Sequence, residues 1–346
     1  MWDGPVLLPA ETAIAAPVQA PVQAPVLENG QAPVQAPQML ISSARAATLK
    51  LTNQRPAAAP HAPVLIKGAQ DFTLDAARII ADPALDLSAP LKGPFMAQHL
   101  EWPEQAAAAL ELARLAGILP AFLVNPVNGG EAQPVAASDL AAWADTSRLN
   151  IASRAHLPIT ASDKSEIIAF RSMDDTREHV ALVIGEQMSD RPPLVRLHSE
   201  CLTGDILGSL KCDCGPQLDA ALLAMADHAA QGGWGVLLYL RQEGRGIGLI
   251  NKMRAYKLQD QGFDTVEANQ RLGLPEEARD FATAARMLEL LGVGEIRLMT
   301  NNPRKVEALE AANIRILERV PHQLPANPHN ARYLATKRDR SGHLIK

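Results

Sequence analysis

Short apolar runs alternate with amphipathic segments through the second half of the chain, and this pattern predicts an α/β domain. Each run is bounded by turn residues and is the length of one strand. The predicted strands cover residues 166–171, 179–185, 193–200, 235–240, 295–300 and 314–320. Apolar positions at helical spacing predict helices over residues 217–230, 249–261, 280–291 and 303–312, with Gly292 ending the third.

The first half carries similar but less regular material. Residues 39–51 predict a strand or turn that runs into a helix, with a serine cap before Ala44. An Ala/Leu-rich helix is predicted over 104–117, with Gly117 as its C′ residue, followed by a buried strand over 118–124. Another helix is expected to begin near 138–143. Residues 150–165 have the composition of a loop, and we place the domain boundary there.

The chain thus divides into three expected parts, covering residues 1–40, 41–150 and 151–346. In the first, the tetrapeptide APVQ recurs between Ala16 and Gln35. Such a Pro/Ala/Gln-rich stretch cannot close a core and favours extended chain. We therefore expect a smaller α/β domain and a larger mixed α/β (α+β) domain behind a low-complexity segment.

Charge and composition exclude several classes of protein. Across 346 residues the formal net charge is −5, which argues against a general nucleic-acid binder but leaves room for a local phosphate pocket. No apolar run is long enough to span a membrane, and the N-terminus lacks the basic region of a signal peptide. Three cysteines are too few for a disulfide framework. A cytoplasmic protein is expected.

The three cysteines lie close together, with the spacing C-x10-C-x-C at Cys201, Cys212 and Cys214. Three thiolates can hold zinc and leave a fourth position for water, whose pKa the metal lowers to about 7. His198 is a possible fourth ligand that would close the site. Small buried thiols in a core are the alternative, which the polar neighbours Lys211 and Asp213 disfavour. In extended chain, C-x-C would direct both thiols to one side.

Three further motifs follow strands or begin helices. RQEGRGIGL (241–249) is a Gly-rich turn with Arg241 and Arg245, suited to phosphate or simply to a tight turn. In TNNPRKVEAL (300–309), Asn302 is expected to cap a helix whose free amides attract anions within reach of Lys305. In LGLPEEARDF (272–281), Arg279 follows Glu277, as an exposed ion pair or a phosphate-handling pair. Together the motifs suggest zinc-dependent hydrolysis of a phosphorylated, nucleotide-like substrate.

These motifs, in their long context, closely resemble the GTP cyclohydrolase II family over roughly residues 150–346. The resemblance implies conversion of GTP to formate, pyrophosphate and a diaminopyrimidinone ribosylamino 5′-phosphate, the opening step of riboflavin biosynthesis, with Zn²⁺ and Mg²⁺. It implies that Cys201, Cys212 and Cys214 bind zinc. It further implies that GTP is contacted by Arg196, Leu197, His198, Ser199, Glu200, Gln217, Glu243, Gly244, Arg245, Thr265, Thr300 and Lys305.

The same resemblance implies catalytic roles. Arg279 corresponds to a nucleophile that attacks the α-phosphorus and expels pyrophosphate. Glu277 stands where the family usually has an aspartate proton acceptor, and Glu276 is the adjacent competitor. Tyr256 is expected to contribute near the purine. The small molecule GTP is the expected partner, with neither nucleic acid nor membrane, in a homodimer.

Two segments of the first half, 40–51 and 111–124, resemble parts of a 3,4-dihydroxy-2-butanone 4-phosphate synthase domain. The acidic metal-binding stretch and the histidine motif of that family are absent, so an inactive, degenerate relative is expected. For the whole chain, two alternatives remain open. One is a paralogue that acts on GTP in another pathway, and the other is a non-catalytic, zinc-stabilised binding module.

Overall fold

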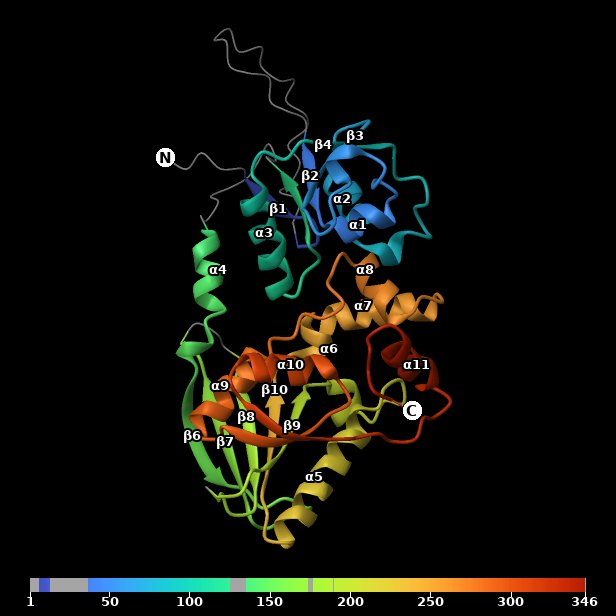
Figure 1. Cartoon of the computed structure of the whole chain (residues 1–346). Helices are drawn as coiled ribbons and strands as arrows, with labels where there is room; N and C mark the ends of the chain where they lie inside the picture. The colour runs from blue at the N-terminus through green and yellow to red at the C-terminus, as the bar shows by residue number, and fades with distance from the viewer. Residues whose placement is uncertain (1–5, 13–36, 125–134, 174–176, 189, 346) are drawn as a thin grey trace. The chain divides into compact units, whose positions relative to one another are not determined.

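The computed structural model describes residues 6–12, 37–124, 135–173, 177–188 and 190–345, and these form two compact units (Figure 1). The first unit contains residues up to 140 together with 250–276, and the second contains 141–249 together with 277–346. The APVQ repeat lies outside the described residues. Both units mix sheet and helix, as the α/β pattern predicts.

The first unit is built on an antiparallel five-stranded sheet of order β1-β5-β2-β3-β4. Its strands are β1 (Leu7–Pro9), β2 (Gln38–Ile41), β3 (Val64–Gly68), β4 (Phe95–Gln98) and β5 (Ala121–Val124). Its helices are α1 (Ser43–Thr48), α2 (Leu74–Ala81) and α3 (Pro103–Leu115). Short 3₁₀ turns cover Arg55–Ala57 and Pro83–Leu85. Ala106 and Ala113 of α3 pack on Leu40 and Phe122 of the sheet.

Local sequence signals set the ends of these helices. Ser42 caps α1 by accepting a hydrogen bond from the Arg45 amide. Gly117 follows α3 with a φ of 72°, the left-handed conformation expected of a C′ glycine. The predicted helix at 249–261 is confirmed as α7 (Leu249–Asp260), and α8 (Thr265–Arg271) follows it. Both helices belong mainly to the first unit, where Asn251 of α7 donates to the Gly117 carbonyl.

The second unit is built on a seven-stranded sheet of order β12-β11-β9-β10-β8-β7-β6, parallel from β12 to β10 and antiparallel from there to β6. The strands predicted for this half are confirmed with nearly the expected bounds, and β6 is added to them. The strands are β6 (Asn150–His156), β7 (Ser165–Arg171), β8 (His179–Ile184), β9 (Leu194–Ser199), β10 (Gly235–Leu240), β11 (Glu295–Met299) and β12 (Arg315–Val320).

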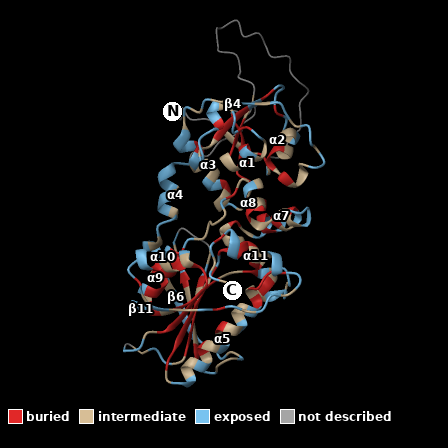
Figure 2. Ribbon diagram, turned by 45° about the vertical axis from the view of Figure 1, so that its right-hand side comes forward, coloured by how far each residue is buried: buried red, intermediate tan, exposed pale blue. Residues whose placement is uncertain are grey.

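Helices cover both faces of this sheet. They are α5 (Cys214–Ala230) on one face and α9 (Ala282–Leu290) and α10 (Pro303–Ala311) on the other. The short helix α6 (Glu243–Gly246) follows β10, and α11 (Ala331–Asp339) follows β12 in the chain. Helix α4 (Ala137–Trp143) and a 3₁₀ turn at Thr146–Arg148 precede the sheet. The buried positions gather on the sheet and on the helix faces against it (Figure 2). The expectation of a loop over 150–165 was wrong in part, because 150–156 forms β6, an edge strand whose side chains are largely exposed.

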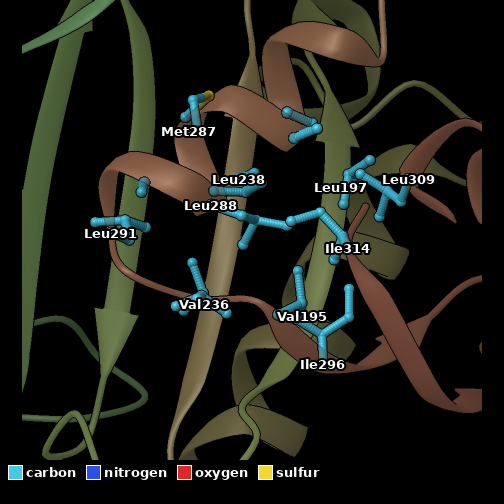
Figure 3. Close-up of a cluster of buried hydrophobic side chains, with 14 of the residues drawn as sticks. Val195, Leu197, Val236, Leu238, Met287, Leu288, Leu291, Ile296, Leu309 and Ile314 are labelled. Carbon is cyan, nitrogen blue, oxygen red and sulfur yellow. The ribbon is translucent and has the colours of Figure 1, made fainter. Parts of the chain in front are cut away.

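The alternation of side chains along β9 decides where the functional residues face. Val195 and Leu197 point into a core formed with α9 and α10, shown in Figure 3. Leu194, one position before, packs instead with Ala221 and Met225 of α5. Because successive side chains of a strand point to opposite faces, Arg196 and His198 lie on the α5 side. Within the described residues, no helix has the length and apolar character needed to cross a membrane.

Candidate active site

The predicted motifs follow the carboxyl ends of three neighbouring parallel strands. Residues 200–201 follow β9, residues 241–249 follow β10, and residues 300–305 follow β11. In open α/β sheets this edge is where ligands commonly bind. The topology therefore brings together motifs that lie far apart in the sequence.

The three cysteines form one group, in which each sulfur lies within 4.8 Å of the others. Cys201 follows β9, and its Sγ lies 3.8 Å from that of Cys212. The expectation that C-x-C would be extended was wrong, because Cys212 precedes the first turn of α5 and Cys214 is its first residue. A turn into a helix brings the two thiols together instead.

A glycine makes room for this group. Gly204 lies in a π-helical turn (Leu202–Ile206), and its amide nitrogen lies 3.3 Å from the Sγ of Cys201. A Cβ at Gly204 would stand 2.9 Å from the Sγ of Cys212 and 3.1 Å from that of Cys201. Three converging thiols with an amide donor are the ligand chemistry that zinc prefers. Among the described residues this group contains cysteines alone, and His198 is not part of it.

Two of the three thiols have raised pKa values. Hydrogen bonding from Cys201 and Cys212, together with burial, raises the pKa of Cys214 well above its usual value. The pKa of Cys212 is also raised, first by its hydrogen bond with Cys201. Because a metal binds thiolates, its binding here must release protons.

Asp205 connects the cysteine turn to the sheet. Its carboxylate lies 3.0 Å from Nε2 of His198 and accepts hydrogen bonds from the Tyr239 hydroxyl (2.9 Å) and the Cys201 amide (3.0 Å). The rings of His198 and Tyr239 stack with centroids 5.6 Å apart. Burial lowers the pKa of His198 despite the opposing effect of Asp205. Sequence reasoning missed Asp205 and Tyr239, although the acid lies inside the cysteine motif and the tyrosine lies near the end of an otherwise apolar strand.

Arg196 and Gln217 meet on the α5 side of the sheet. Nη2 of Arg196 donates to Oε1 of Gln217 at 2.5 Å, and burial lowers the pKa of this arginine to about 10. Its buried Nε has no hydrogen-bond partner. A buried cation with an unused donor is suited to an anionic ligand.

Arg279 and Glu277 form an ion pair, and the ring of Phe281 lies near both this pair and the cation Lys305. Nε of Arg279 donates to Glu277 at 2.6 Å, and Nη2 donates to the second carboxylate oxygen. Burial alone would raise the pKa of Glu277, but the hydrogen bonds and charge of Arg279 lower it overall. Phe281, which the motifs did not mark as a site residue, has its ring 5.2 Å from the Arg279 guanidinium and 5.8 Å from Lys305 Nζ.

Lys305 lies in the first turn of α10, as expected, but its side chain does not lie along the free amides of that turn. Asn302 caps the helix by accepting from the Arg304 amide, and Pro303 occupies its first turn. The Lys305 ammonium donates to the Leu197 carbonyl at 2.7 Å rather than lying along the free amides of the helix. Burial, followed by the charges of Arg279 and Arg196, lowers the pKa of Lys305 well below its usual value.

The glycine-rich turn after β10 holds left-handed backbone. Gly244 and Arg245 have φ values of 65° and 63°, and the Arg245 carbonyl accepts from the Ala278 amide at 3.1 Å. One guanidinium nitrogen of Arg245, Nη2, is buried without a hydrogen-bond partner. The Glu243 carboxylate accepts from the Leu202 amide at 2.7 Å, which ties this turn to the cysteine turn.

The remaining predicted residues are Leu197, which contributes its backbone, three polar residues with side chains in the second unit, and two residues of the first unit. Leu197 contributes its carbonyl, since its side chain lies in the core. Ser199 has a buried hydroxyl without a partner, Glu200 pairs with Arg241 at 3.0 Å, and the Thr300 hydroxyl accepts from the Asn302 amide. Tyr256 on α7 and Thr265 on α8 belong to the first unit, so they are not among the residues that the second unit brings together.

Comparison with known proteins agrees with this geometry. Residues 150–321 match the family model of GTP cyclohydrolase II. The chain is 42% identical to GTP cyclohydrolase-2 of Azospirillum brasilense over 89% of this chain and 81% of that protein. It is 44% identical to the riboflavin biosynthesis protein RibBA of Bacillus cereus (strain ATCC 14579), over 69% of this chain and 64% of that protein.

Among solved structures, a two-domain 3,4-dihydroxy-2-butanone 4-phosphate synthase from A. baumannii, RibBX, is 17% identical with a TM-score of 0.30, covering 82% of this chain and 84% of that one. The family assignment rests on the sequence comparisons alone. They cover all the motifs of the second unit, from the cysteine group to Lys305. This chain belongs to the GTP cyclohydrolase II family.

Proposed function

We propose that this chain hydrolyses GTP to formate, pyrophosphate and a diaminopyrimidinone ribosylamino 5′-phosphate, the opening step of riboflavin biosynthesis. One juxtaposition carries the proposal. A three-cysteine cradle of the kind that binds zinc shares a sheet edge with the Arg279–Glu277 pair and with buried cations. The first feature suits opening of a ring, and the second suits displacement at a phosphorus.

In this proposal Cys201, Cys212 and Cys214 hold one zinc ion per chain. Zinc bound there would polarise a water molecule for hydrolysis at C8 of the guanine ring. Asp205 orients His198 and Tyr239 beside the cradle through the bonds described above. The Tyr239 hydroxyl and Nε2 of His198 are both engaged by Asp205, whereas Nδ1 of His198 is buried without a hydrogen-bond partner, and we propose that it faces the substrate.

The polyphosphate is proposed to lie against the buried cations. Arg196, Arg245 and Lys305 are each partly or wholly buried, and two of them have an unused nitrogen. A triphosphate would neutralise them, and Mg²⁺ would enter with the phosphate oxygens that it prefers. The remaining proposed contacts to GTP are those of Leu197, Ser199, Glu200, Gln217, Glu243, Gly244, Thr265 and Thr300.

Arg279 is proposed as the nucleophile at the α-phosphorus and Glu277 as its proton acceptor. A guanidinium is normally cationic and a poor nucleophile, so it needs a base in contact with it. Glu277 accepts the bonds from Nε and Nη2, which favours it over its neighbour Glu276 as that base. The lowered pKa of Glu277 keeps this carboxylate ionised, so it carries no proton of its own where it contacts Arg279. Tyr256 is proposed to contribute near the purine.

For the rest of the chain we propose the division at residues 40 and 150, with a degenerate, inactive synthase-like first domain. We also propose a homodimer. Ile206, Leu207 and Leu210 beside the cysteine turn are 56–72% exposed, and such grouped apolar side chains are typical of protein interfaces. Light scattering of Leu207→Asp against the unsubstituted protein tests this.

The deciding experiment is incubation of the purified protein with GTP and Mg²⁺. The proposal requires formate and pyrophosphate in equal amounts, together with a pyrimidine product. Retention of an intact purine ring would exclude this activity and favour a paralogue with another product. Absence of any turnover, combined with a fully protein-ligated zinc, would favour a binding module.

A further inference from the structure

The family match ends at residue 321, but the chain continues along the site. His322 exchanges two hydrogen bonds with Asn301, and its Nε2 lies 2.8 Å from the Gln217 carbonyl. Further along, the Leu344 amide donates to the Asn301 carbonyl at 2.8 Å. Residues 322–345 are thereby fastened at both ends to the turn after β11.

Helix α11 in this segment carries a buried cation. Nζ of Lys337 donates to Oδ1 of Asp213 at 2.7 Å and lies 4.5 Å from the centroid of the Tyr333 ring. The side chain of Lys337 is 11% exposed. The ammonium is thus held between a carboxylate and a ring face, which is the geometry of a group that holds another residue in place.

Asp213 passes this contact on to two residues of the site. Its second oxygen, Oδ2, accepts from Nε2 of Gln217 at 2.6 Å. With its amide nitrogen held in this way, Gln217 presents Oε1 to Nη2 of Arg196 at 2.5 Å. The four side chains form one hydrogen-bonded chain from Lys337 to Arg196, whose Nε remains unused.

We propose that Lys337 is a positioning residue for GTP, which orients Arg196 toward the substrate through Asp213 and Gln217. The inference rests on the proposed function, since it assigns a role in binding that same substrate. Its physical basis is a competition for Asp213. While Lys337 holds the carboxylate, Arg196 bonds to neutral Gln217 and keeps a donor for an anion. Without Lys337, Asp213 would attract the Arg196 guanidinium directly, and that donor would turn away from the substrate.

The test compares variants of the full-length protein. Lys337→Met removes the ammonium with little change in length, Lys337→Arg restores a cation, and Arg338→Met is the matched control on the exposed side of the same helix. Each is titrated with a GTP analogue that carries an α,β-methylene bridge, by calorimetry, and its kcat, KM and zinc content are measured.

We expect Lys337→Met to weaken binding of the analogue by about tenfold or more and to raise KM, with kcat less affected and zinc retained. Lys337→Arg should recover most of the affinity, and Arg338→Met should match the unsubstituted protein. A double variant with Gln217→Ala should bind no more weakly than Gln217→Ala alone, because both changes break the same chain.

Unchanged affinity in Lys337→Met, or fully additive losses in the double variant, would overturn the positioning role. So would failure of Lys337→Arg to recover binding while folding normally. If Lys337→Met does not fold, the other two variants decide. The proposal then requires that Lys337→Arg recovers most of the affinity for the analogue and that Gln217→Ala binds it more weakly than the unsubstituted protein. Formate release by the unsubstituted protein is scored separately, so that loss of the proposed function is distinguished from loss of this inference.

Discussion

The guanidinium of Arg279 donates two hydrogen bonds to the carboxylate of Glu277, which lies only two residues before it. The Arg279 amide also donates to the same carboxylate at 3.1 Å. This triple contact fixes the arginine relative to its own backbone. The pair is therefore held rigidly, as the proposed roles of nucleophile and base require.

We expect Arg279→Ala to abolish release of both pyrophosphate and formate, because in the proposed mechanism displacement at phosphorus is the first step. Glu277→Gln should slow both steps by about a hundredfold or more, since a positioned base contributes on that scale. Glu276→Gln is the matched control and should matter much less. Near-normal pyrophosphate release by Arg279→Ala, or a larger effect of Glu276→Gln, would show that the roles are assigned wrongly.

Replacing Cys212 by Ser should separate the two chemical events. The variant should lose zinc and formate release, yet still release pyrophosphate from GTP, because the hydrogen bonds that hold the Arg279–Glu277 pair involve none of the thiols. The fold should persist, since the core against β9 and β10 contains no cysteine among its described residues. Metal content by atomic absorption and a pyrophosphate assay check this. Formate production by zinc-free protein would refute the hydrolytic role of the metal.

Much of the second unit could be predicted from its sequence, because period-two and period-3.6 patterns are dense there. Strands β7 to β12 and helices α5, α9 and α10 follow those patterns closely. Strand β6 could not be recognised, since an exposed edge strand buries few side chains and shows no apolar alternation. Helix α11 was missed for a similar reason, because its buried positions include Thr336 and Lys337.

The site was predictable in its motifs but not in its connections. The cysteine spacing predicted the three-cysteine group, whereas the contacts of Asp205 with His198 and Tyr239 depend on three separate elements. No local pattern could show that Lys305 reaches back to the Leu197 carbonyl, which lies 108 residues away. Long-range pairs of this kind depend on the order of the strands in the sheet, and the pattern of a single sequence does not reveal that order.

The first domain is expected to lack synthase activity. The full-length protein should not convert ribulose 5-phosphate to dihydroxybutanone phosphate and formate, because the acidic and histidine metal ligands of that reaction are absent from the sequence. Chromatographic detection of the four-carbon product checks this. Turnover above background, retained in an Arg279→Ala variant, would show that the first domain is active.

A methyl group at residue 204 should damage the metal group. The Cβ of Gly204→Ala would stand 2.9 Å from the Sγ of Cys212, closer than real contacts permit, and 3.1 Å from that of Cys201, which is tighter than most. We expect at least a several-fold fall in bound zinc and in formate release. Release of pyrophosphate should persist, as expected for Cys212→Ser. Gly294→Ala is the control, since a Cβ there would meet nothing within 4 Å and the φ of Gly294 is not left-handed. Equal zinc content in both variants would show that Gly204 is not needed to make room for a metal at the three cysteines.

The C-terminal segment should loosen in acid because of His343. Burial lowers the pKa of His343 to about 3, and the charges of Lys337 and Arg245 act in the same direction. An unfolded histidine titrates near about 6.5, so below that pH the unfolded state binds a proton that the folded state refuses. The contribution of His343 to stability should therefore be constant above pH ~6.5 and be lost progressively toward pH ~3.

The measurement is thermal unfolding of the full-length protein at pH ~7.5 and pH ~5.5, on either side of the pKa of an unfolded histidine. His343→Gln keeps a neutral polar side chain, so it should reduce the loss of melting temperature between the two conditions. His329→Gln is the control, because His329 is exposed. The effect should be partial, since burial also lowers the pKa of His322 to about 4 and this second histidine contributes in the same pH range. An identical acid-induced loss in His343→Gln and the unsubstituted protein would show that His343 does not govern the stability of this segment.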